Sequence, residues 1–335
     1  MGGSSWSGQA YNSVQHTRKV TGQSAMTYND NVIRSTPVHL RKTHDEMDPK
    51  QFNNGIRESR DSDVHPNSNA IAVFFDVTGS MENTPRVFQE KLGKLMSMLV
   101  EKGYIEHPQV MIGAVGDAYT DRAPIQAGQF ESGLEMDSDL GKLYLEAAGG
   151  GQMHESYGLV HYLMANHTAI DCWEKRQKKG YLFTIGDEKP WDTIKRDQVE
   201  SLIGDKLEAD IPLKDIIDKV QERYHVYHII PEHGTYYAGN KEIKEAWRKL
   251  LGERVLLLED TNAISETIAL TIGLNEGTID VVDGLDDLAS LGIDAKTIAA
   301  AGRAVSTIKT NPNSKAVAIV GNVPTSAAVA TVEEL

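Results

Sequence analysis

The stretch at residues 70–82 reads AIAVFFDVTGSME, and its pattern indicates how the rest of the chain is organised. Residues 71–75 form a continuous apolar run, which is typical of a β-strand buried on both faces. Asp76 stands at the carboxyl end of this run, and Thr78 and Ser80 follow at alternate positions. One carboxylate and two hydroxyls are therefore expected in the loop that leaves a buried strand.

A helix is predicted directly after this loop. Thr84 and Pro85 suit the N-cap and the first helical residue. Apolar residues then recur at helical spacing, at Phe88, Leu92, Leu95, Met96 and Leu99. In an open parallel sheet, ligands bind in the crevice outside the carboxyl ends of the strands. Oxygen donors without a thiol or an imidazole suit a hard divalent cation, so the loop predicts a site for Mg²⁺ or Mn²⁺.

Strands and helices alternate along the rest of the central segment. Further apolar runs at residues 110–115, 181–185, 224–230 and 255–258 predict strands, and helical patterns separate most of them. This alternation is typical of a doubly wound α/β fold with a mostly parallel sheet. A short strand predicted at 125–130 follows the strand at 110–115 too closely for a crossover helix. These two strands are therefore expected to form an antiparallel hairpin, with one antiparallel strand at the edge of the sheet.

The motif DVTGS at residues 76–80, after a buried strand, resembles the start of a known metal site. It is similar to the D-x-[ST]-x-S motif of the metal-ion-dependent adhesion site (MIDAS) of von Willebrand factor A (VWA) domains. The resemblance implies a VWA or Rossmann-like sheet, with Asp76, Thr78 and Ser80 as metal ligands from the first loop. A third loop of this family supplies an aspartate after a later strand, and Asp187 matches it.

The second loop of such a site departs from the family pattern. It usually supplies a threonine from a glycine-rich loop before a helix, and here residues 149–156 read GGGQMHES, without a threonine. A similar GGG…E pattern occurs in the VWA domains attached to alpha-kinases, which makes Glu155 or Ser156 the substitute. We include Glu155 in the predicted metal set and leave the choice between the two open. Asp117, at the end of the neighbouring strand, is a candidate for orienting a ligand.

Charge and cysteine content exclude several classes of protein. The chain has 335 residues and a formal net charge of −14, which argues against a nucleic acid or an acidic membrane as partner. Cys172 is the only cysteine, so an intramolecular disulfide and a thiolate zinc site are both excluded. The sequence shows no secretory signal and no apolar run of about 20 residues, and a cytoplasmic location is expected.

Two extensions flank the central domain, which is predicted at residues 68–274, the span of the resemblance. Residues 1–67 are polar without a sustained period, and an extended or partly disordered arm is expected. Residues 275–335 carry no aromatic residue, and one short helix at 296–308 with a flexible tail is expected. Neither extension has the apolar density of a core, so both are predicted to be dispensable for folding. The arm and the tail are also candidate contacts in a homo-oligomer.

These features predict a divalent-metal-dependent protein-binding module of the adhesion or scaffold type. An acidic side chain of a partner protein would complete the metal coordination, and no catalytic residue is predicted. The alternative is a haloacid-dehalogenase-like phosphoryl-transfer enzyme that uses Mg²⁺, because DVTGS also resembles a DKTGT motif whose aspartate is the nucleophile. Asp76 would then be that nucleophile. Glu82 stands where an apolar residue is usual, and no catalytic lysine is clearly placed, so the binding module is preferred.

Overall fold

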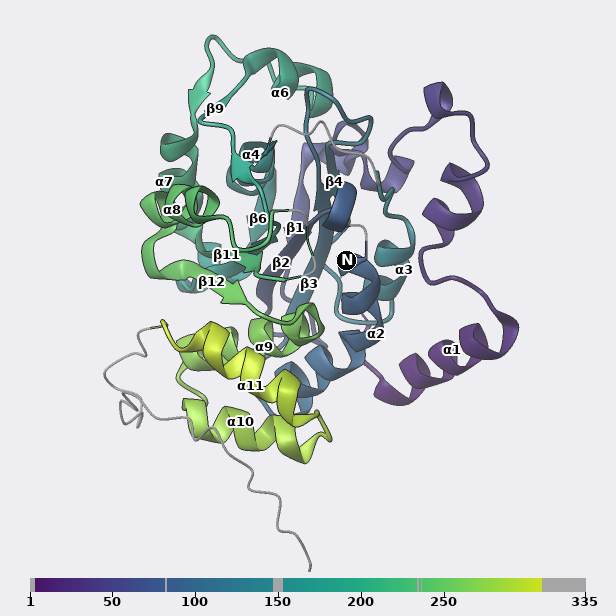
Figure 1. Cartoon of the computed structure of the whole chain (residues 1–335), viewed down its shortest axis with the longest axis vertical. Helices are drawn as coiled ribbons and strands as arrows, with labels where there is room; N and C mark the ends of the chain where they lie inside the picture. The colour runs from purple at the N-terminus through teal and green to yellow at the C-terminus, as the bar shows by residue number, and fades with distance from the viewer. Residues whose placement is uncertain (1–3, 82, 147–152, 234, 236, 309–335) are drawn as a thin grey trace, which may run out of the picture.

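The computed structural model describes residues 4–81, 83–146, 153–233, 235 and 237–308. Its centre is a six-stranded sheet in the order β12-β11-β7-β2-β3-β4 (Figure 1). Neighbouring strands are parallel, except that β4 runs antiparallel to β3 at one edge. The predicted doubly wound α/β fold with one antiparallel edge strand is confirmed. The strands of the sheet are β2 (Asn69–Asp76), β3 (Pro108–Val115), β4 (Ile125–Ala127), β7 (Gly180–Ile185), β11 (Tyr224–Pro231) and β12 (Val255–Leu258).

Strand β2 lies in the middle of the sheet, and all of its residues are buried. It pairs with β3 over its whole length and with β7 from Ile71 to Phe75. Side chains of a strand point alternately to opposite faces, so Val73 enters one apolar core and Phe74 the other. The chain continues from β2 to β3 on one side and returns to β7 on the other. The connections thus leave β2 in opposite directions at its carboxyl end, where Asp76 stands, and this is the position at which open α/β sheets usually bind ligands.

Helices cover both faces of the sheet, because both faces are apolar (Figure 1). One face is covered by α2 (Thr84–Met96), α3 (Glu135–Gly141) and α9 (Ile264–Glu276). The other is covered by α4 (Tyr157–Asn166), α5 (Asp171–Arg176), α6 (Arg196–Leu202), α7 (Leu213–Arg223) and α8 (Lys241–Leu251). Local sequence sets their ends: the Asn240 side chain caps α8, and Gly252 follows its last residue. Of the helices described, none is long and apolar enough to cross a membrane.

Three small two-stranded pairs lie outside the main sheet. Two of them are parallel and one is antiparallel. They are β1 (Arg57–Ser59) with β6 (Thr168–Ile170), β5 (His154–Glu155) with β8 (Lys189–Pro190), and β9 (Thr193–Ile194) with β10 (Ile211–Pro212). Strand β5 precedes α4 in the chain, and β8 follows β7. Their pairing therefore joins the loop before α4 to the loop after β7.

The N-terminal arm is folded and packed against the rest of the chain, which corrects the expectation of an extended or partly disordered segment (Figure 1). It begins with α1 (Gly8–Thr21), which the Ser7 side chain caps. Tyr11, Met26 and Met47 are buried in the core that also contains α2 and α9. Short helical turns follow as η1 (Tyr28–Ile33), η2 (Val38–Leu40), η3 (Asp45–Met47), η4 (Pro49–Gln51) and η5 (Asn53–Gly55). The buried residues have no common period, which is why sequence patterning missed them.

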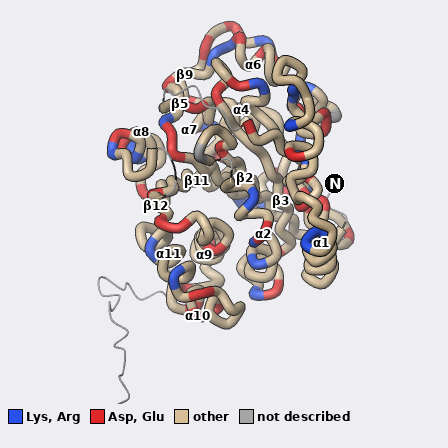
Figure 2. Tube along the Cα trace, turned by 45° about the vertical axis from the view of Figure 1, so that its right-hand side comes forward, with Lys and Arg blue, Asp and Glu red and all other residues tan. Residues whose placement is uncertain are grey.

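Ion pairs also connect the arm to the rest of the chain. Arg86 of α2 donates to both carboxylate oxygens of Asp30, at 2.8 and 2.7 Å. Arg18 of α1 pairs with Asp137 of α3 at 2.7 Å. Figure 2 shows basic and acidic positions interleaved along the trace. Opposite charges therefore meet where the arm lies on the helices.

Replacing Asp30 with Asn is expected to lower stability at neutral pH and progressively less at acidic pH. Hydrogen bonds from Arg86 hold the pKa of Asp30 well below its ordinary value of 3.8. The ionised Asp30 carboxylate makes its full contribution to the free energy of unfolding at pH values above its pKa in the unfolded chain. This contribution is lost as the pH falls from about 4 toward the pKa of Asp30 in the folded protein. We expect Asp30→Asn to lose about 1 kcal/mol at pH 7. Urea unfolding followed by circular dichroism should show this difference shrinking between pH 4 and pH 2, and a difference independent of pH would contradict the assignment.

Up to residue 308, where the described residues end, the C-terminal extension contains two helices, and the sequence predicted one. They are α10 (Val281–Ser290) and α11 (Ala295–Val305), and they pack against α9 (Figure 1). Leu288, Ala301 and Val305 are buried in the same core as α9. The extension thus adds a layer to that face of the sheet. The predicted tail from residue 309 onward lies outside the described residues.

Candidate metal centre

The Asp76 carboxylate is fully buried and held by hydrogen bonds on both oxygens. The backbone N–H and the Oγ1 hydroxyl of Thr78 donate to Oδ1, at 2.9 and 2.6 Å. The Tyr157 hydroxyl donates to Oδ2 at 3.2 Å. Because Asp76 is the last residue of β2, its position is set by a central strand whose residues are all buried. Ser80 lies in the short helical turn η6 (Gly79–Met81), and its side chain lies outside the described part of the structure.

Three carboxyl groups converge beside this loop. Asp76, Glu155 and Glu188 each offer an oxygen, and these atoms lie within 4.8 Å of one another. The β5–β8 pair connects the two segments that carry the glutamates: His154 pairs with Lys189 and Glu155 with Pro190, and Glu188 directly precedes β8. Glu155 is 2% exposed, and its Oε2 atom has no hydrogen-bond partner among the described residues. The cluster therefore combines two buried carboxyl groups, Asp76 and Glu155, with the partly exposed Glu188, and one buried oxygen is left unpaired.

The electrostatics of the cluster favour a bound cation. Burial raises the pKa of Asp76 well above its usual range, and the nearby carboxylates of Glu188 and Asp187 raise it further. Burial likewise raises the pKa of Glu155, with Asp76 adding to the effect. The pKa of Glu188 is raised for the same reason. Carboxylates brought together away from water need protons or a cation to offset their mutual repulsion.

The other predicted ligands border this cluster. Asp187, two residues after the end of β7, is buried, and its Oδ2 accepts a hydrogen bond from the Tyr237 N–H at 3.0 Å. It does not belong to the group of three carboxylates identified in the described part of the chain, and its neighbour Glu188 does. Ser156 was the alternative to Glu155 in the second loop. Its hydroxyl accepts from the Ala118 N–H at 2.9 Å, on the loop after β3, whereas Glu155 faces the cluster.

Asp117 occupies a supporting position on that same loop. Its Oδ1 accepts hydrogen bonds from the Trp191 Nε1–H at 3.0 Å and from the Tyr119 N–H at 3.2 Å. These contacts join the loop after β3 to the segment after β8. Of the glycine-rich loop, residues 149–152 lie outside the described residues.

Sequence analysis did not predict two residues of the candidate site, Glu188 and Tyr157. Glu188 stands directly after the predicted ligand Asp187, and only the direction of the chain after β7 distinguishes them. Tyr157 belongs to a helical apolar pattern that is typical of core residues. Gly186 provides a signal for its role, because a Cβ atom there would lie 1.9 Å from the Tyr157 hydroxyl and 2.9 Å from the Asp76 Cβ. A side chain at residue 186 would thus displace the hydrogen bond to Asp76.

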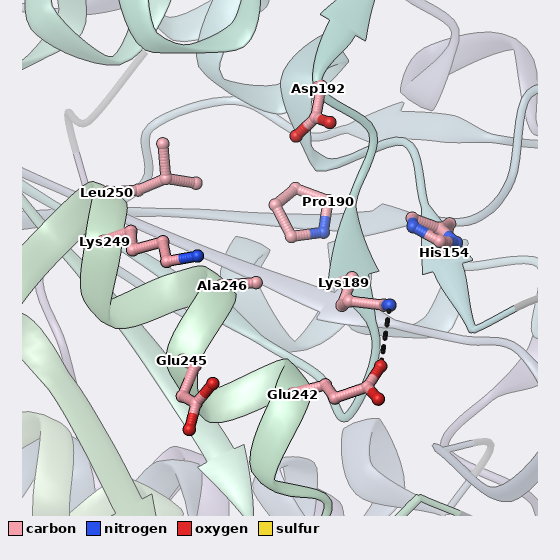
Figure 3. A pocket seen from close by; sticks show the side chains of 9 residues that line it. All are labelled: His154, Lys189, Pro190, Asp192, Glu242, Glu245, Ala246, Lys249 and Leu250. Carbon is pink, nitrogen blue, oxygen red and sulfur yellow. Dashed lines mark hydrogen bonds and ion pairs between the residues drawn. The ribbon is translucent and has the colours of Figure 1, made fainter.

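A pocket of about 420 Å³ lies next to the cluster, between β5, β8 and α8 (Figure 3). Pro190, Ala246 and Leu250 provide its apolar part, and charged side chains surround them. Lys189 and Glu242 form an ion pair of 3.4 Å across one side, as Figure 3 shows. The pocket is lined by His154 and Lys189, the neighbours in sequence of Glu155 and Glu188. A concave surface therefore adjoins the backbone that carries two of the three carboxylates.

Comparison with known proteins shows only distant likeness. No family model matches the sequence, and no curated protein does. Among solved structures, the pilus adhesin SpaC from Lactobacillus rhamnosus GG in its open conformation has 10% identity and a TM-score of 0.43, over 65% of this chain and 31% of that chain. The proximal thread matrix protein 1 (PTMP1) of the mussel byssus, with a zinc-occupied MIDAS motif, has 13% identity and a TM-score of 0.38, over 61% of this chain and 47% of that chain.

A third solved structure is the conserved hypothetical protein BatB from Bacteroides thetaiotaomicron. It has 14% identity and a TM-score of 0.33, over 60% of this chain and 95% of that chain. This chain therefore spans about a third to a half of the adhesin and the byssus protein, and nearly all of BatB.

Proposed function

We propose that this protein is a protein-binding module of the adhesion or scaffold type that depends on a divalent metal ion. The observation that carries the proposal is the cluster of Asp76, Glu155 and Glu188, with oxygens within 4.8 Å of one another. The buried Oε2 atom of Glu155 has no hydrogen-bond partner among the residues that the structure describes. A buried carboxylate oxygen left unpaired is costly, and a cation would offset that cost. The arrangement thus supports a metal centre.

The donors suit a hard cation, and we propose Mg²⁺ or Mn²⁺. Carboxylate and hydroxyl oxygens are the preferred protein ligands of such ions. Asp76 and Glu155 would supply carboxylate oxygens and Thr78 a hydroxyl. The motif resemblance adds Ser80 and Asp187 to this set, and the geometry of the cluster adds Glu188. In this proposal the protein supplies a prepositioned, largely dry set of oxygens.

A partner's acidic side chain is proposed to complete the coordination. The negative charge of the site works against this, because the three clustered carboxylates exceed the charge of a divalent ion by one and Asp187 would add a further negative charge. A partner carboxylate would therefore have to replace Glu155 or Glu188 on the metal, or arrive at a site that retains a proton. A neutral oxygen of the partner is the competing case, and the two can be separated by experiment.

The test uses the full chain and Mn²⁺. Calorimetry should show one Mn²⁺ site per chain, and Mg²⁺ should compete for it. Water-proton relaxation then reports the water left on the bound Mn²⁺. Adding N-acetyl-aspartyl amide should displace this water and lower the relaxation, while the isosteric N-acetyl-asparaginyl amide should not. Equal effects of both amides would indicate a neutral oxygen ligand, and absence of Mn²⁺ binding would overturn the metal site itself.

The phosphoryl-transfer alternative receives no support from the site. An aspartate nucleophile must present a carboxylate oxygen to the phosphorus atom. The hydrogen bonds to Asp76 found among the described residues come from Thr78 and Tyr157, and none comes from the lysine that this alternative would need. We therefore assign the site to binding and propose no reaction for it.

A further inference from the structure

Three buried aromatic rings form a layer beside the carboxylate cluster. They are Tyr157 of α4, His228 of β11 and Trp247 of α8. The Trp247 ring stacks on His228 with centroids 3.6 Å apart and planes inclined by 14°. Tyr157 meets both rings edge-on, at 5.2 Å from His228 and 5.1 Å from Trp247. The layer therefore joins two helices and one strand through ring contacts alone.

Two hydrogen bonds lead from this layer to the cluster. The Tyr157 hydroxyl donates to the Asp76 Oδ2 atom at 3.2 Å. The Trp247 Nε1–H donates to the main-chain carbonyl of Glu188 at 2.9 Å. Neighbouring rings thus hold two of the three residues that supply carboxylates: Asp76 through its side chain and Glu188 through its backbone.

The layer has little freedom to rearrange. The pKa of His228 lies well below its usual range because the ring is buried, so the ring is neutral at neutral pH. Its Nδ1 atom lies 2.8 Å from the Thr184 hydroxyl. The carbonyl of Tyr157 accepts a hydrogen bond from the His161 Nδ1 atom at 2.8 Å. Gly186 leaves no space for a side chain against the Tyr157 hydroxyl. These contacts fix the ring orientations, and with them the two hydrogen bonds.

We propose that Tyr157 and Trp247 are positioning residues of the metal centre, which set the separation of Asp76 and Glu188. This inference rests on the proposed function, since it assigns a role toward the metal that the cluster would hold. Partners of this kind, one shell outside the ligands, hold the donor atoms at the spacing that the ion requires. Trp247 also ties the centre to α8, whose opposite side lines the pocket in Figure 3.

The experiment measures Mn²⁺ affinity of the full chain by calorimetry in Tyr157→Phe and Trp247→Phe. Each substitution keeps an aromatic ring and removes one hydrogen-bond donor. We expect the dissociation constant of each variant to rise about 10-fold, the lower end of the usual effect of such partners. Tyr162→Phe is the matched control for the first, because it removes a hydroxyl from the same helix that donates to Asp205. Trp173→Phe, on α5 and packed against the same apolar core, is the control for the second, and both controls should bind Mn²⁺ like the wild type.

A spectroscopic measurement separates positioning from a merely structural role. Electron paramagnetic resonance of saturated Mn²⁺ should show an altered zero-field splitting in both variants, because the ligand geometry changes. A structural role would lower the melting temperature and leave affinity and spectrum unchanged, and that result overturns the proposal. If Trp247→Phe does not fold, Tyr157→Phe decides, since it removes a single oxygen. Failure of the wild type to bind Mn²⁺ would overturn the proposed function and this inference together, whereas wild-type affinity in the Phe variants overturns this inference alone.

Discussion

Asp76→Ala is expected to abolish Mn²⁺ binding while leaving the metal-free fold intact. The substitution removes a ligand itself, so the loss should exceed the 10–100-fold range that is usual for outer partners. It removes no core volume beyond the carboxyl group. Removing a buried charge favours folding, and loss of the acceptor for Thr78 and Tyr157 opposes it. Calorimetry and a thermal melt of the metal-free protein should therefore show lost binding and a nearly unchanged melting temperature.

Asp260→Ala is the matched control for this prediction. Asp260 follows β12 at the same edge of the sheet, caps the helical turn η9 (Thr261–Ala263) and pairs with Lys296 at 2.6 Å. Its removal should cost about 1 kcal/mol of stability and leave Mn²⁺ binding unchanged. Retained Mn²⁺ binding in Asp76→Ala would show that the metal, if bound, sits elsewhere.

Calorimetric titration with Mn²⁺ also distinguishes the roles of Asp187 and Glu188, the two acidic residues after β7. Glu188→Gln should weaken Mn²⁺ binding more than Asp187→Asn, because Glu188 belongs to the carboxylate cluster and Asp187 accepts a backbone hydrogen bond from Tyr237. The motif resemblance predicts the opposite order. A larger loss in Asp187→Asn would therefore restore the ligand set that the resemblance implies.

The second large effect is expected from the N-terminal arm. Tyr11→Ala should lower the free energy of unfolding by about 3 kcal/mol, the usual cost of truncating a large buried aromatic ring. The Tyr11 ring is 2% exposed, its hydroxyl donates to the Gln89 carbonyl, and its edge lies against Gly93. Chemical denaturation should show this loss. Val20→Ala, on the same helix and 70% exposed, should change stability by less than about 0.5 kcal/mol.

This expectation replaces the prediction that the arm is dispensable. Each fully buried apolar side chain contributes about 1.5–3 kcal/mol, and the arm buries Tyr11, Met26 and Met47 in one core and Phe52 in the other. Together these contributions are comparable to the whole stability of a typical domain. A Tyr11→Ala protein as stable as the wild type would show that the arm is held loosely and restore the earlier prediction.

The sequence alone determined the fold class and the position of the loop after β2 that carries Asp76 and Thr78. The information for both is local: an apolar run of five residues identifies β2, the following oxygen donors identify the loop, and the recurrence from Phe88 identifies α2. The antiparallel edge strand also follows locally, because the connection between β3 and β4 is too short for a helix. Burial of an entire strand and a period of 3.6 residues are each visible within a short window.

Tertiary structure decided which residues meet at the site and which segments complete the core. Whether Asp187 or Glu188 joins Asp76 depends on how the chain turns after β7 and pairs with β5, and neighbouring side chains point in different directions. In the sequence, Tyr157 cannot be distinguished from an ordinary core residue, and only the structure places it next to Gly186 and Trp247. The arm was misjudged because Tyr11, Met26 and Met47 are isolated in a polar sequence. These side chains are buried against residues far away in the chain, so a local sequence pattern does not reveal their burial.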